Sequence, residues 1–185
     1  MNSFILDRKK TGLMIVDVQS KLFELVDRSC PVKTMLIKLI KAFNILKMPI
    51  VLSEQYPKGL GPTIPALKEL LSEDHLYIEK TSFSCLGTPD NREKLLEMDV
   101  DQWVVAGIEA HVCVFQTVRD LISHGKQVVV VNDAITSRSV FDFSTAISEM
   151  RDCGARISST ETVIFELVCD SKAPEFKEMS ELIKQ

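Results

Sequence analysis

Histidine, tryptophan and tyrosine are scarce in this chain, which has three His, one Trp and two Tyr among its 185 residues. The histidines, at positions 75, 111 and 124, include no closely spaced pair, so the sequence offers no zinc-ligand set of the usual spacing. The phosphate-cradling motifs G-x-G-x-x-G and G-x-x-x-x-G-K-[ST] are also missing, and nucleotide binding therefore has no support. We expect no metal and no other cofactor.

Long apolar runs are missing as well. None reaches the roughly 18 residues that a membrane-spanning helix needs, so we expect no membrane association. The N-terminal segment MNSFILDRKKTG places its apolar residues before its basic ones, the reverse of a secretory signal. The five cysteines are odd in number and form no C-x-x-C motif, which favours free thiols in a reducing compartment. A cytoplasmic location is expected.

The charge pattern argues against nucleic-acid binding. The formal net charge is −4, and no cluster of Lys and Arg forms the basic stripe that recruits phosphates. Hydrophobic residues make up 45% of the chain and charged residues 26%, as is usual for a globular protein. Because 185 residues suffice for one well-buried domain and not for two of ordinary size, we expect a single domain over residues 1–185.

Short apolar runs alternate with amphipathic segments along the whole chain. The runs predict strands at residues 12–16, 50–52, 76–78, 103–107, 128–131 and 155–158. Helices are predicted at residues 32–47, 66–71, 112–124 and 141–153, with others beginning near Asp90 and at a cap formed by Thr160. Such alternation predicts an α/β, Rossmann-like fold: a mainly parallel sheet covered by helices on both faces.

Polar residues follow several predicted strands, at the edge of the sheet where ligands bind in this fold class. Asp17 follows the first strand, Lys80 the third, and Cys113 opens the helix after the fourth. A helix N-terminus stabilises a thiolate, Asp17 could accept the thiol proton, and Lys80 could orient that carboxylate by charge pairing. Together these three residues predict a nucleophilic cysteine site. Asn132 and Asp133 are expected just after the fifth strand, where Asp133 braces a turn.

Each of these residues also has an ordinary structural interpretation. A lone cysteine on a helix is usually a core residue, an aspartate after a strand is often a turn cap, and a lysine is usually solvated. Cys113 and Arg119 also form C-x5-R, the phosphate-binding signature of tyrosine phosphatases. The five residues between them contain no Gly and predict a helix, so this match lacks the loop that the motif requires.

Segments across nearly the whole chain resemble the isochorismatase-like cysteine hydrolases. They are Ile15-Val16-Asp17-Val18-Gln19, Glu79-Lys80-Thr81-Ser82-Phe83, Gly107-Ile108-Glu109-Ala110-His111-Val112-Cys113-Val114, Asp133-Ala134 and Ser137-Arg138. The resemblance is closest to the isochorismatase-domain-containing subgroup, and it implies a six-stranded, mainly parallel sheet. It also implies a catalytic triad of Asp17, Lys80 and Cys113, with a cis peptide bond between Ile108 and Glu109.

The resemblance further implies the chemistry. Backbone N–H groups of Glu109 and Cys113 would form an oxyanion hole, and Cys113 would attack a small amide or related carbonyl to give a thioester that is then hydrolysed. A homo-oligomer is expected by resemblance alone. The alternative is a non-catalytic binding or scaffold protein that retains the hydrolase fold. The sequence does not identify a substrate.

Departures from relatives narrow these expectations. Metal-dependent nicotinamidases carry an Asp and two His near the second strand, whereas residues 53–59 contain no His. True isochorismatases lack the cysteine, so Cys113 argues against vinyl-ether cleavage. Ala110-His111 replaces the Thr-Asp found in many relatives, with an unknown effect on specificity. Four residues in the strand-end loops are weaker candidates for the substrate pocket: Gln19, Phe23, Tyr56 and Phe83.

Overall fold

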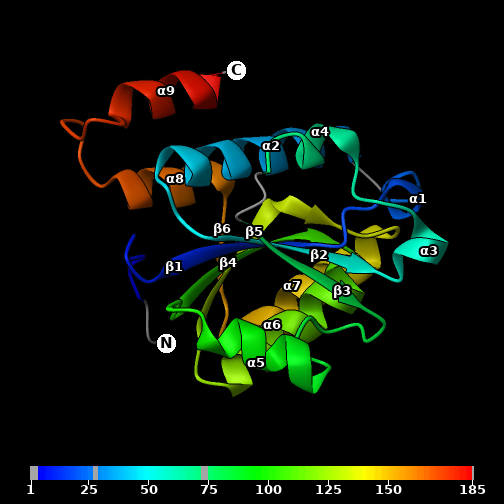
Figure 1. The fold of residues 1–185 in the computed structure, drawn as a ribbon. Helices are drawn as coiled ribbons and strands as arrows, with labels where there is room; N and C mark the ends of the chain where they lie inside the picture. The colour runs from blue at the N-terminus through cyan, green and yellow to red at the C-terminus, as the bar shows by residue number, and fades with distance from the viewer. Residues whose placement is uncertain (1–3, 27–28, 72–74, 185) are drawn as a thin grey trace.

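A parallel sheet forms the centre of the computed structural model, which describes residues 4–26, 29–71 and 75–184 (Figure 1). Its strands are β1 (Thr11–Val16), β2 (Ile50–Gln55), β3 (Leu76–Lys80), β4 (Gln102–Ile108), β5 (Gln127–Thr136) and β6 (Arg156–Ser158). Their order is β3-β2-β1-β4-β5-β6, and all neighbours are parallel. The predicted six-stranded sheet is therefore confirmed.

Helices cover both faces of this sheet. They are α1 (Ser20–Phe23), α2 (Ser29–Ile45), α3 (Pro57–Leu60), α4 (Pro65–Lys68), α5 (Pro89–Glu97), α6 (Phe115–Ser123), α7 (Val140–Asp152), α8 (Thr160–Val168) and α9 (Phe176–Lys184). A π-helical turn, η1 (Ala110–Val114), precedes α6. Helices α2, α4 and α8 lie on one face, with α9 outside them, while α5, α6 and α7 lie on the other (Figure 1).

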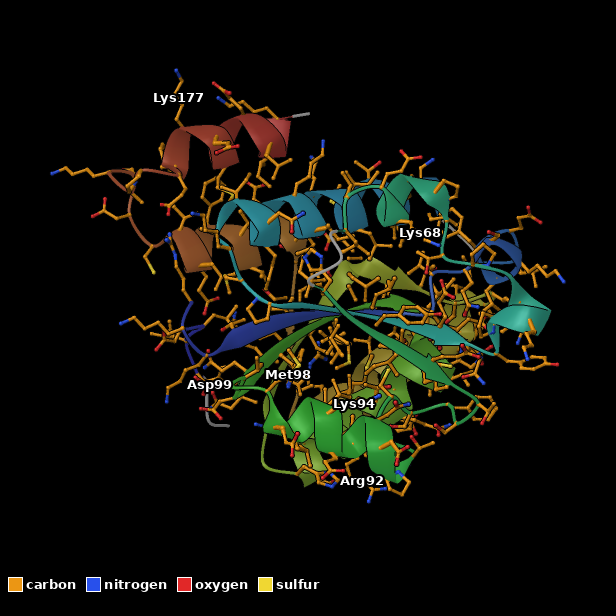
Figure 2. All side chains as sticks on the ribbon, in the orientation of Figure 1. Lys68, Arg92, Lys94, Met98, Asp99 and Lys177 are labelled. Carbon is orange, nitrogen blue, oxygen red and sulfur yellow. The ribbon has the colours of Figure 1, made fainter. Side chains whose placement is uncertain are left out.

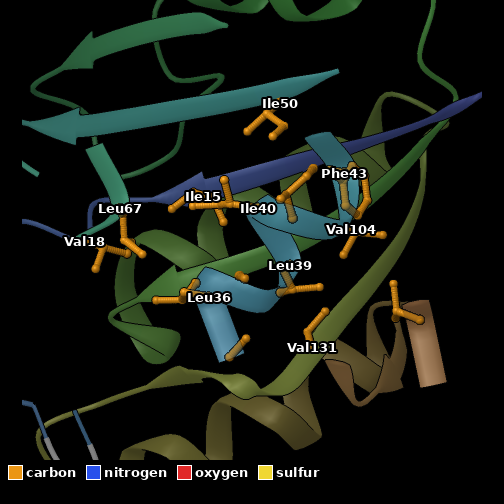
Figure 3. Close-up of a cluster of buried hydrophobic side chains, with 14 of the residues drawn as sticks. Ile15, Val18, Leu36, Leu39, Ile40, Phe43, Ile50, Leu67, Val104 and Val131 are labelled. Atoms are coloured by element: carbon orange, nitrogen blue, oxygen red, sulfur yellow. The ribbon is translucent and has the colours of Figure 1, made fainter. Parts of the chain in front are cut away.

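The core divides into two layers because successive strand residues face opposite sides of the sheet. Leu13 and Ile15 pack under α2, whereas Met14 and Val16 pack toward α5, α6 and α7. Figure 3 shows the first layer, in which α2 contributes Leu36, Leu39, Ile40 and Phe43. Burying each such side chain stabilises the fold by about 1.5–3 kcal/mol before entropy is counted.

Among the described residues, the charged side chains other than Asp17, Glu54, Lys80 and Glu109 are at least partly exposed. Of the labelled basic residues, Lys68 and Lys177 belong to the α2 side of the molecule, and Arg92 and Lys94 to the α5 helix on the opposite side (Figure 2). Within the described ranges, no helix is long and apolar enough to cross a membrane.

Several local predictions need correction. The fifth strand runs to Thr136, with a register shift against β4 between Val105 and Gly107, so Asn132 and Asp133 lie within the strand and not after it. Asp133 accepts hydrogen bonds from the backbone N–H and the hydroxyl of Thr160 (both 2.9 Å). Ser159, and not Thr160, caps α8, because its side chain accepts from the N–H of Thr162.

The direction in which successive strands are added reverses at the centre of the sheet. From β1 the chain moves outward to β2 and β3, and from β4 it moves outward to β5 and β6. The carboxyl ends of β1 and β4 are thus the topological switch point, where parallel sheets of this kind bind ligands. Gly107 lets these strands approach closely: its φ is +126°, and a Cβ there would lie 2.1 Å from the carbonyl oxygen of Val16.

Candidate active site

Asp17 occupies the switch point directly after β1. Its φ of +51° is in the left-handed region, which Asp tolerates better than most residues. Its N–H donates to the carbonyl of Ser53 on the neighbouring strand (3.1 Å), so the chain turns while still bonded to β2. The residue is fully buried. Conformations of this kind cluster at functional sites, because the surrounding structure must hold them in place.

Lys80 is the last residue of β3 and forms a buried ion pair with Asp17. Its Nζ donates to Asp17 Oδ2 at 2.6 Å, and both side chains are 0% exposed. Burial is the largest single effect and acts to lower the pKa of Lys80, but the negative charge and hydrogen bond of Asp17, together with contributions from Cys85 and Cys113, outweigh burial and raise it. The lysine is therefore charged, and the sequence prediction that it pairs with Asp17 is matched by this geometry.

Two residues of β2 complete the surroundings of this ion pair. Ser53 Oγ donates to the other carboxylate oxygen of Asp17, Oδ1, at 2.7 Å. Gln55 Oε1 accepts from Lys80 Nζ at 2.8 Å. Sequence reasoning missed both residues, although polar residues two apart at the end of a buried strand were a usable signal, since they share one face of the strand.

Cys113 lies in η1, next to the carboxyl end of β4. The turn begins after Glu109, and the N–H of Phe115 returns to the carbonyl of Ala110, the wider closure of a π-helix. Such single turns occur often at functional sites. Cys113 is 6% exposed and packs in the core layer that includes Val16 and Val114. The prediction that Cys113 opens a regular helix is corrected: α6 begins only at Phe115.

The electrostatics of Cys113 differ from the sequence expectation of a stabilised thiolate. Burial raises the pKa of the Cys113 thiol, the adjacent Asp17 carboxylate raises it further, and Lys80 only partly opposes them. A helix N-terminus favours a thiolate by typically 0.3–1 kcal/mol when exposed, which is less than the cost of burying that charge beside a carboxylate. In the resting protein the thiol is therefore protonated and lies next to a carboxylate.

The backbone N–H groups of Glu109 and Cys113 are the oxyanion-hole donors that the resemblance implies. The peptide bond between Ile108 and Glu109 is cis, which is the bond for which the resemblance implies that geometry. Within the described ranges, the N–H of Glu109, which precedes η1, donates none of the backbone hydrogen bonds found outside helices and strands. The Glu109 side chain is engaged elsewhere, since Oε2 accepts from the backbone N–H and from Nε of Arg138 (both 3.0 Å).

The residues predicted to line a pocket fall into different environments. Gln19 is fully buried, and its amide bonds to both backbone groups of Gln55 and to the carbonyl of Gly61. Phe23 packs partly buried against the α2 core layer. Tyr56 and Phe83 are each about half exposed, at 53% and 52%. The contacts of Gln19 need no ligand to account for them, and a pocket role for the other three stays a prediction.

A second buried thiol, missed from the sequence, lies in the same region. Cys85 is fully buried, and its N–H donates to Thr117 Oγ1 at 3.0 Å, one helical turn beyond Cys113. Burial raises the pKa of Cys85, against the opposing charge of Lys80. Cys85, Cys113, Cys153 and Cys169 are free thiols, and the side chain of Cys30 lies outside the described residues.

A cavity of about 340 Å³ lies at the end of β5, where Ile135, Ser137, Val140 and Phe143 are among its lining residues. Asp17, Lys80 and Cys113 do not line it. It lies close to η1, because His111 Nδ1 is 2.9 Å from Ser137 Oγ. In the part of the chain that the structure describes, no group of three or more His, Cys, Asp or Glu residues could hold a metal ion.

Comparison with known proteins identifies relatives over most of this chain. The family model described as "Isochorismatase domain" matches residues 11–162. A protein of Danio rerio named isochorismatase domain-containing protein 2 is 39% identical over 179 residues, which cover 96% of this chain and 89% of that protein.

Solved structures agree with this. A Caenorhabditis elegans protein described as MAR1 ribonuclease is 38% identical, with a TM-score of 0.92 over 98% of this chain and 93% of its own. The Escherichia coli YcaC gene product, described as an octameric hydrolase of unknown specificity, is 22% identical. Its TM-score is 0.89 over 100% of this chain and 97% of its own, a likeness that shows the fold alone.

Proposed function

Because the chain belongs to the isochorismatase family, we propose that it is a cysteine-dependent hydrolase with Cys113 as nucleophile, Asp17 as base and Lys80 as its charged partner. The observation that carries this proposal is the ion pair of Asp17 and Lys80, buried beside a protonated thiol on a π-helical turn. Buried ion pairs contribute little net stability, so stability alone does not account for this pair, whereas catalysis would use both of its charges.

The reaction follows from these positions. The Cys113 sulfur attacks the carbonyl carbon of a small amide or related compound while the thiol proton passes to the Asp17 carboxylate. The N–H groups of Glu109 and Cys113 donate hydrogen bonds to the carbonyl oxygen and stabilise the negative charge that develops on it. The tetrahedral intermediate formed by this attack then collapses. Its bond to the leaving group breaks, the leaving group takes the proton from Asp17, and a thioester with Cys113 remains.

Hydrolysis of the thioester follows, with water as the nucleophile and the Cys113 sulfur as the leaving group. Water attacks the thioester carbon as Asp17 accepts its proton, and the carboxylic acid departs as the sulfur recovers that proton from Asp17. A thiol that is protonated at rest fits a base that acts during attack, so no preformed thiolate is needed. Before each attack, Lys80 balances the negative charge of the Asp17 carboxylate and holds the carboxylate oxygens in place.

The substrate is proposed to be small, because only 6% of Cys113 is exposed. The ribonuclease name of the worm relative makes RNA cleavage a second candidate. The net charge of −4 and the basic residues spread over both sides of the molecule (Figure 2) do not favour a polynucleotide. We therefore retain the small carbonyl compound, and no nucleic-acid partner.

The test uses p-nitrophenyl acetate, an activated ester that reports acylation without knowledge of the natural substrate. We expect mass spectrometry to find a transient acetyl group on Cys113, with nitrophenol released in a burst. Cys113→Ala should lose both signals, and Cys169→Ala, which removes an exposed free thiol, should keep them. An unchanged burst in Cys113→Ala would contradict the proposal. Incubation with single-stranded RNA, with intact RNA expected, tests the second candidate.

The non-catalytic alternative makes a different prediction. A binding or scaffold protein needs no acyl transfer, so it would show neither the burst nor the acetylated cysteine. Self-association is also proposed, by the family likeness and the octamer described for YcaC. Light scattering should then give a mass well above the 20.8 kDa of one chain, and a value equal to one chain would refute self-association.

A further inference from the structure

Two side chains of strand β2, those of Ser53 and Gln55, form hydrogen bonds with the proposed active-site residues Asp17 and Lys80. Ser53 and Gln55 are two residues apart, so they point to the same side of the sheet. That side is the one on which Val51 packs with Cys113, in the core layer under α5, α6 and α7. Ser53 forms a short hydrogen bond with the carboxylate of the ion pair, and Gln55 forms one with its ammonium group.

Ser53 holds Asp17 at two points. Its carbonyl accepts the N–H of Asp17 (3.1 Å), and its hydroxyl donates to Oδ1 (2.7 Å). Oδ2 is then left for Lys80. Because Asp17 has a left-handed backbone conformation, these bonds fix both its backbone and the rotation of its carboxylate. Ser53 is itself fully buried, so no water competes for its hydroxyl.

Gln55 holds Lys80 and is itself fixed by other groups. Its Oε1 accepts from Lys80 Nζ, and its Nε2 donates to the carbonyl of Thr81 (2.7 Å). Its backbone N–H and carbonyl both bond to the Gln19 side chain, at 2.7 and 3.0 Å. A side chain so tied has little rotational freedom, and its Oε1 is held against the charged group of Lys80.

We propose, on the basis of the hydrolase function above, that Ser53 and Gln55 are a matched pair of positioning residues that orient the Asp17 carboxylate and the Lys80 ammonium toward Cys113. The chemistry of the pair is complementary: a hydroxyl that donates to the anion and an amide oxygen that accepts from the cation. Gln19 supports the pair by fixing Gln55. Neither Ser53 nor Gln55 needs to touch the substrate.

The two bonds have opposite effects at the thiol, which makes the proposal testable. The Ser53 hydroxyl directs the positive end of its dipole at Asp17, and removing it leaves the carboxylate more negative toward Cys113. The Gln55 carbonyl directs its negative end at Lys80, and removing it leaves the ammonium more positive. Loss of Ser53 Oγ should therefore disfavour the thiolate, and loss of Gln55 Oε1 should favour it.

The experiment follows alkylation of Cys113 by iodoacetamide against pH, with mass spectrometry, in the full chain. Relative to wild type, Ser53→Ala should slow labelling at pH 8 by about two- to fivefold, and Gln55→Met should accelerate it by a similar factor. Ser53→Thr keeps the hydroxyl and should restore the wild-type rate. Gln55→Glu places a negative charge beside Lys80 and should slow labelling.

Gln102→Leu is the matched control. Gln102 is also buried, and its amide bonds to Ile5, Gln127, Asp7 and Thr11 at the opposite end of the sheet. Its loss should lower the melting temperature without moving the pH profile of Cys113. Thermal unfolding of every variant shows which ones are folded. If Ser53→Ala or Gln55→Met does not fold, the labelling rates of Ser53→Thr and Gln55→Glu test the proposal in its place.

Purely structural loosening predicts something else: both truncations would open the site and accelerate labelling alike. Shifts of the same sign in Ser53→Ala and Gln55→Met, or no shift in either, would overturn the positioning roles. This result is distinct from failure of the proposed function. That failure would appear as a wild-type Cys113 that titrates like an ordinary thiol and transfers no acetyl group from the ester.

Discussion

Asp17 and Lys80, 63 positions apart in the chain, meet at 2.6 Å with neither side chain exposed to solvent. Strand β2 separates their strands, so the lysine side chain has to extend past β2 to reach the switch point between β1 and β4. The thiol of Cys113 interacts with both charges, and these have opposite effects on it: Asp17 raises its pKa and Lys80 lowers it. The reactivity of Cys113 therefore depends on the balance within the pair.

The first prediction separates thiol reactivity from catalysis. Asp17→Asn removes the charge that disfavours the thiolate, so iodoacetamide should label Cys113 at least roughly tenfold faster at neutral pH. The same variant should lose ester turnover, because the proposed base is gone. Lys80→Met should slow labelling, because the carboxylate then acts on the thiol unopposed. Rates that fall in both variants would mean that the charges do not act on Cys113 in this way.

The second prediction concerns stability. Each single variant leaves one charge buried without its partner, so Asp17→Asn and Lys80→Met should each lower the free energy of unfolding by about 3–5 kcal/mol. The double variant leaves no unpaired charge and should lose less than the sum of the two. Urea denaturation at pH 7 measures all three against wild type. Strict additivity would contradict a direct interaction.

The third prediction is a pH dependence at Glu54, outside the proposed triad. Burial acts to raise the pKa of Glu54, but hydrogen bonds from Tyr77 and Thr63 lower it below 4.5 overall. A lowered pKa contributes stability that is present above the unfolded-state value and is lost as the pH falls through the folded-state value. Glu54→Gln should therefore be less stable than wild type at pH 7, by about 1–2 kcal/mol.

The difference between Glu54→Gln and wild type should shrink as the pH falls below 4.5, the ordinary value for this carboxyl. Thermal unfolding between pH 3 and 7 measures it. Tyr77→Phe is the control, since it removes the donor at 2.6 Å and keeps the ring and the carboxylate. A gap between Glu54→Gln and wild type that persists unchanged to pH 3 would show that ionisation of Glu54 is not its source.

The outline of this fold could be predicted from the sequence because buried parallel strands are continuous apolar runs and the helices have an apolar stripe. The secondary-structure predictions that were wrong or missing have physical reasons. Asn132 and Asp133 read as a loop because polar residues usually end a strand, yet the register shift allows β5 to continue beyond them. Helix α1, which contains Phe23, and helix α3, which follows Tyr56, are single turns too short to show periodicity.

At the proposed site, the sequence indicated which residues meet but not how their charges act. Strand-end placement was enough to bring Asp17, Lys80 and Cys113 together. The raised pKa of Cys113 could not be anticipated, since it depends on how much of the thiol is covered and on which oxygen of Asp17 faces it. Ser53, Gln55 and Cys85 were missed for the same reason, because their importance lies in three-dimensional contacts.

The last prediction tests the close approach of β1 and β4 that brings Asp17 and Cys113 into one site. Gly107→Ala adds a Cβ at 2.1 Å from the carbonyl oxygen of Val16. The φ of this residue is +126°, a backbone conformation that residues with a side chain rarely adopt. The strands would have to separate, so the free energy of unfolding should fall by at least about 3 kcal/mol and acylation of Cys113 should be lost. Gly125→Ala is the matched control: its φ is +77°, but, apart from its own residue and chain neighbours, the added Cβ meets no described atom within 4 Å. It should cost only about 1 kcal/mol, the price of the backbone conformation alone, and leave acylation intact. Equal losses in the two variants would mean that backbone conformation, and not the contact with Val16, requires glycine at position 107.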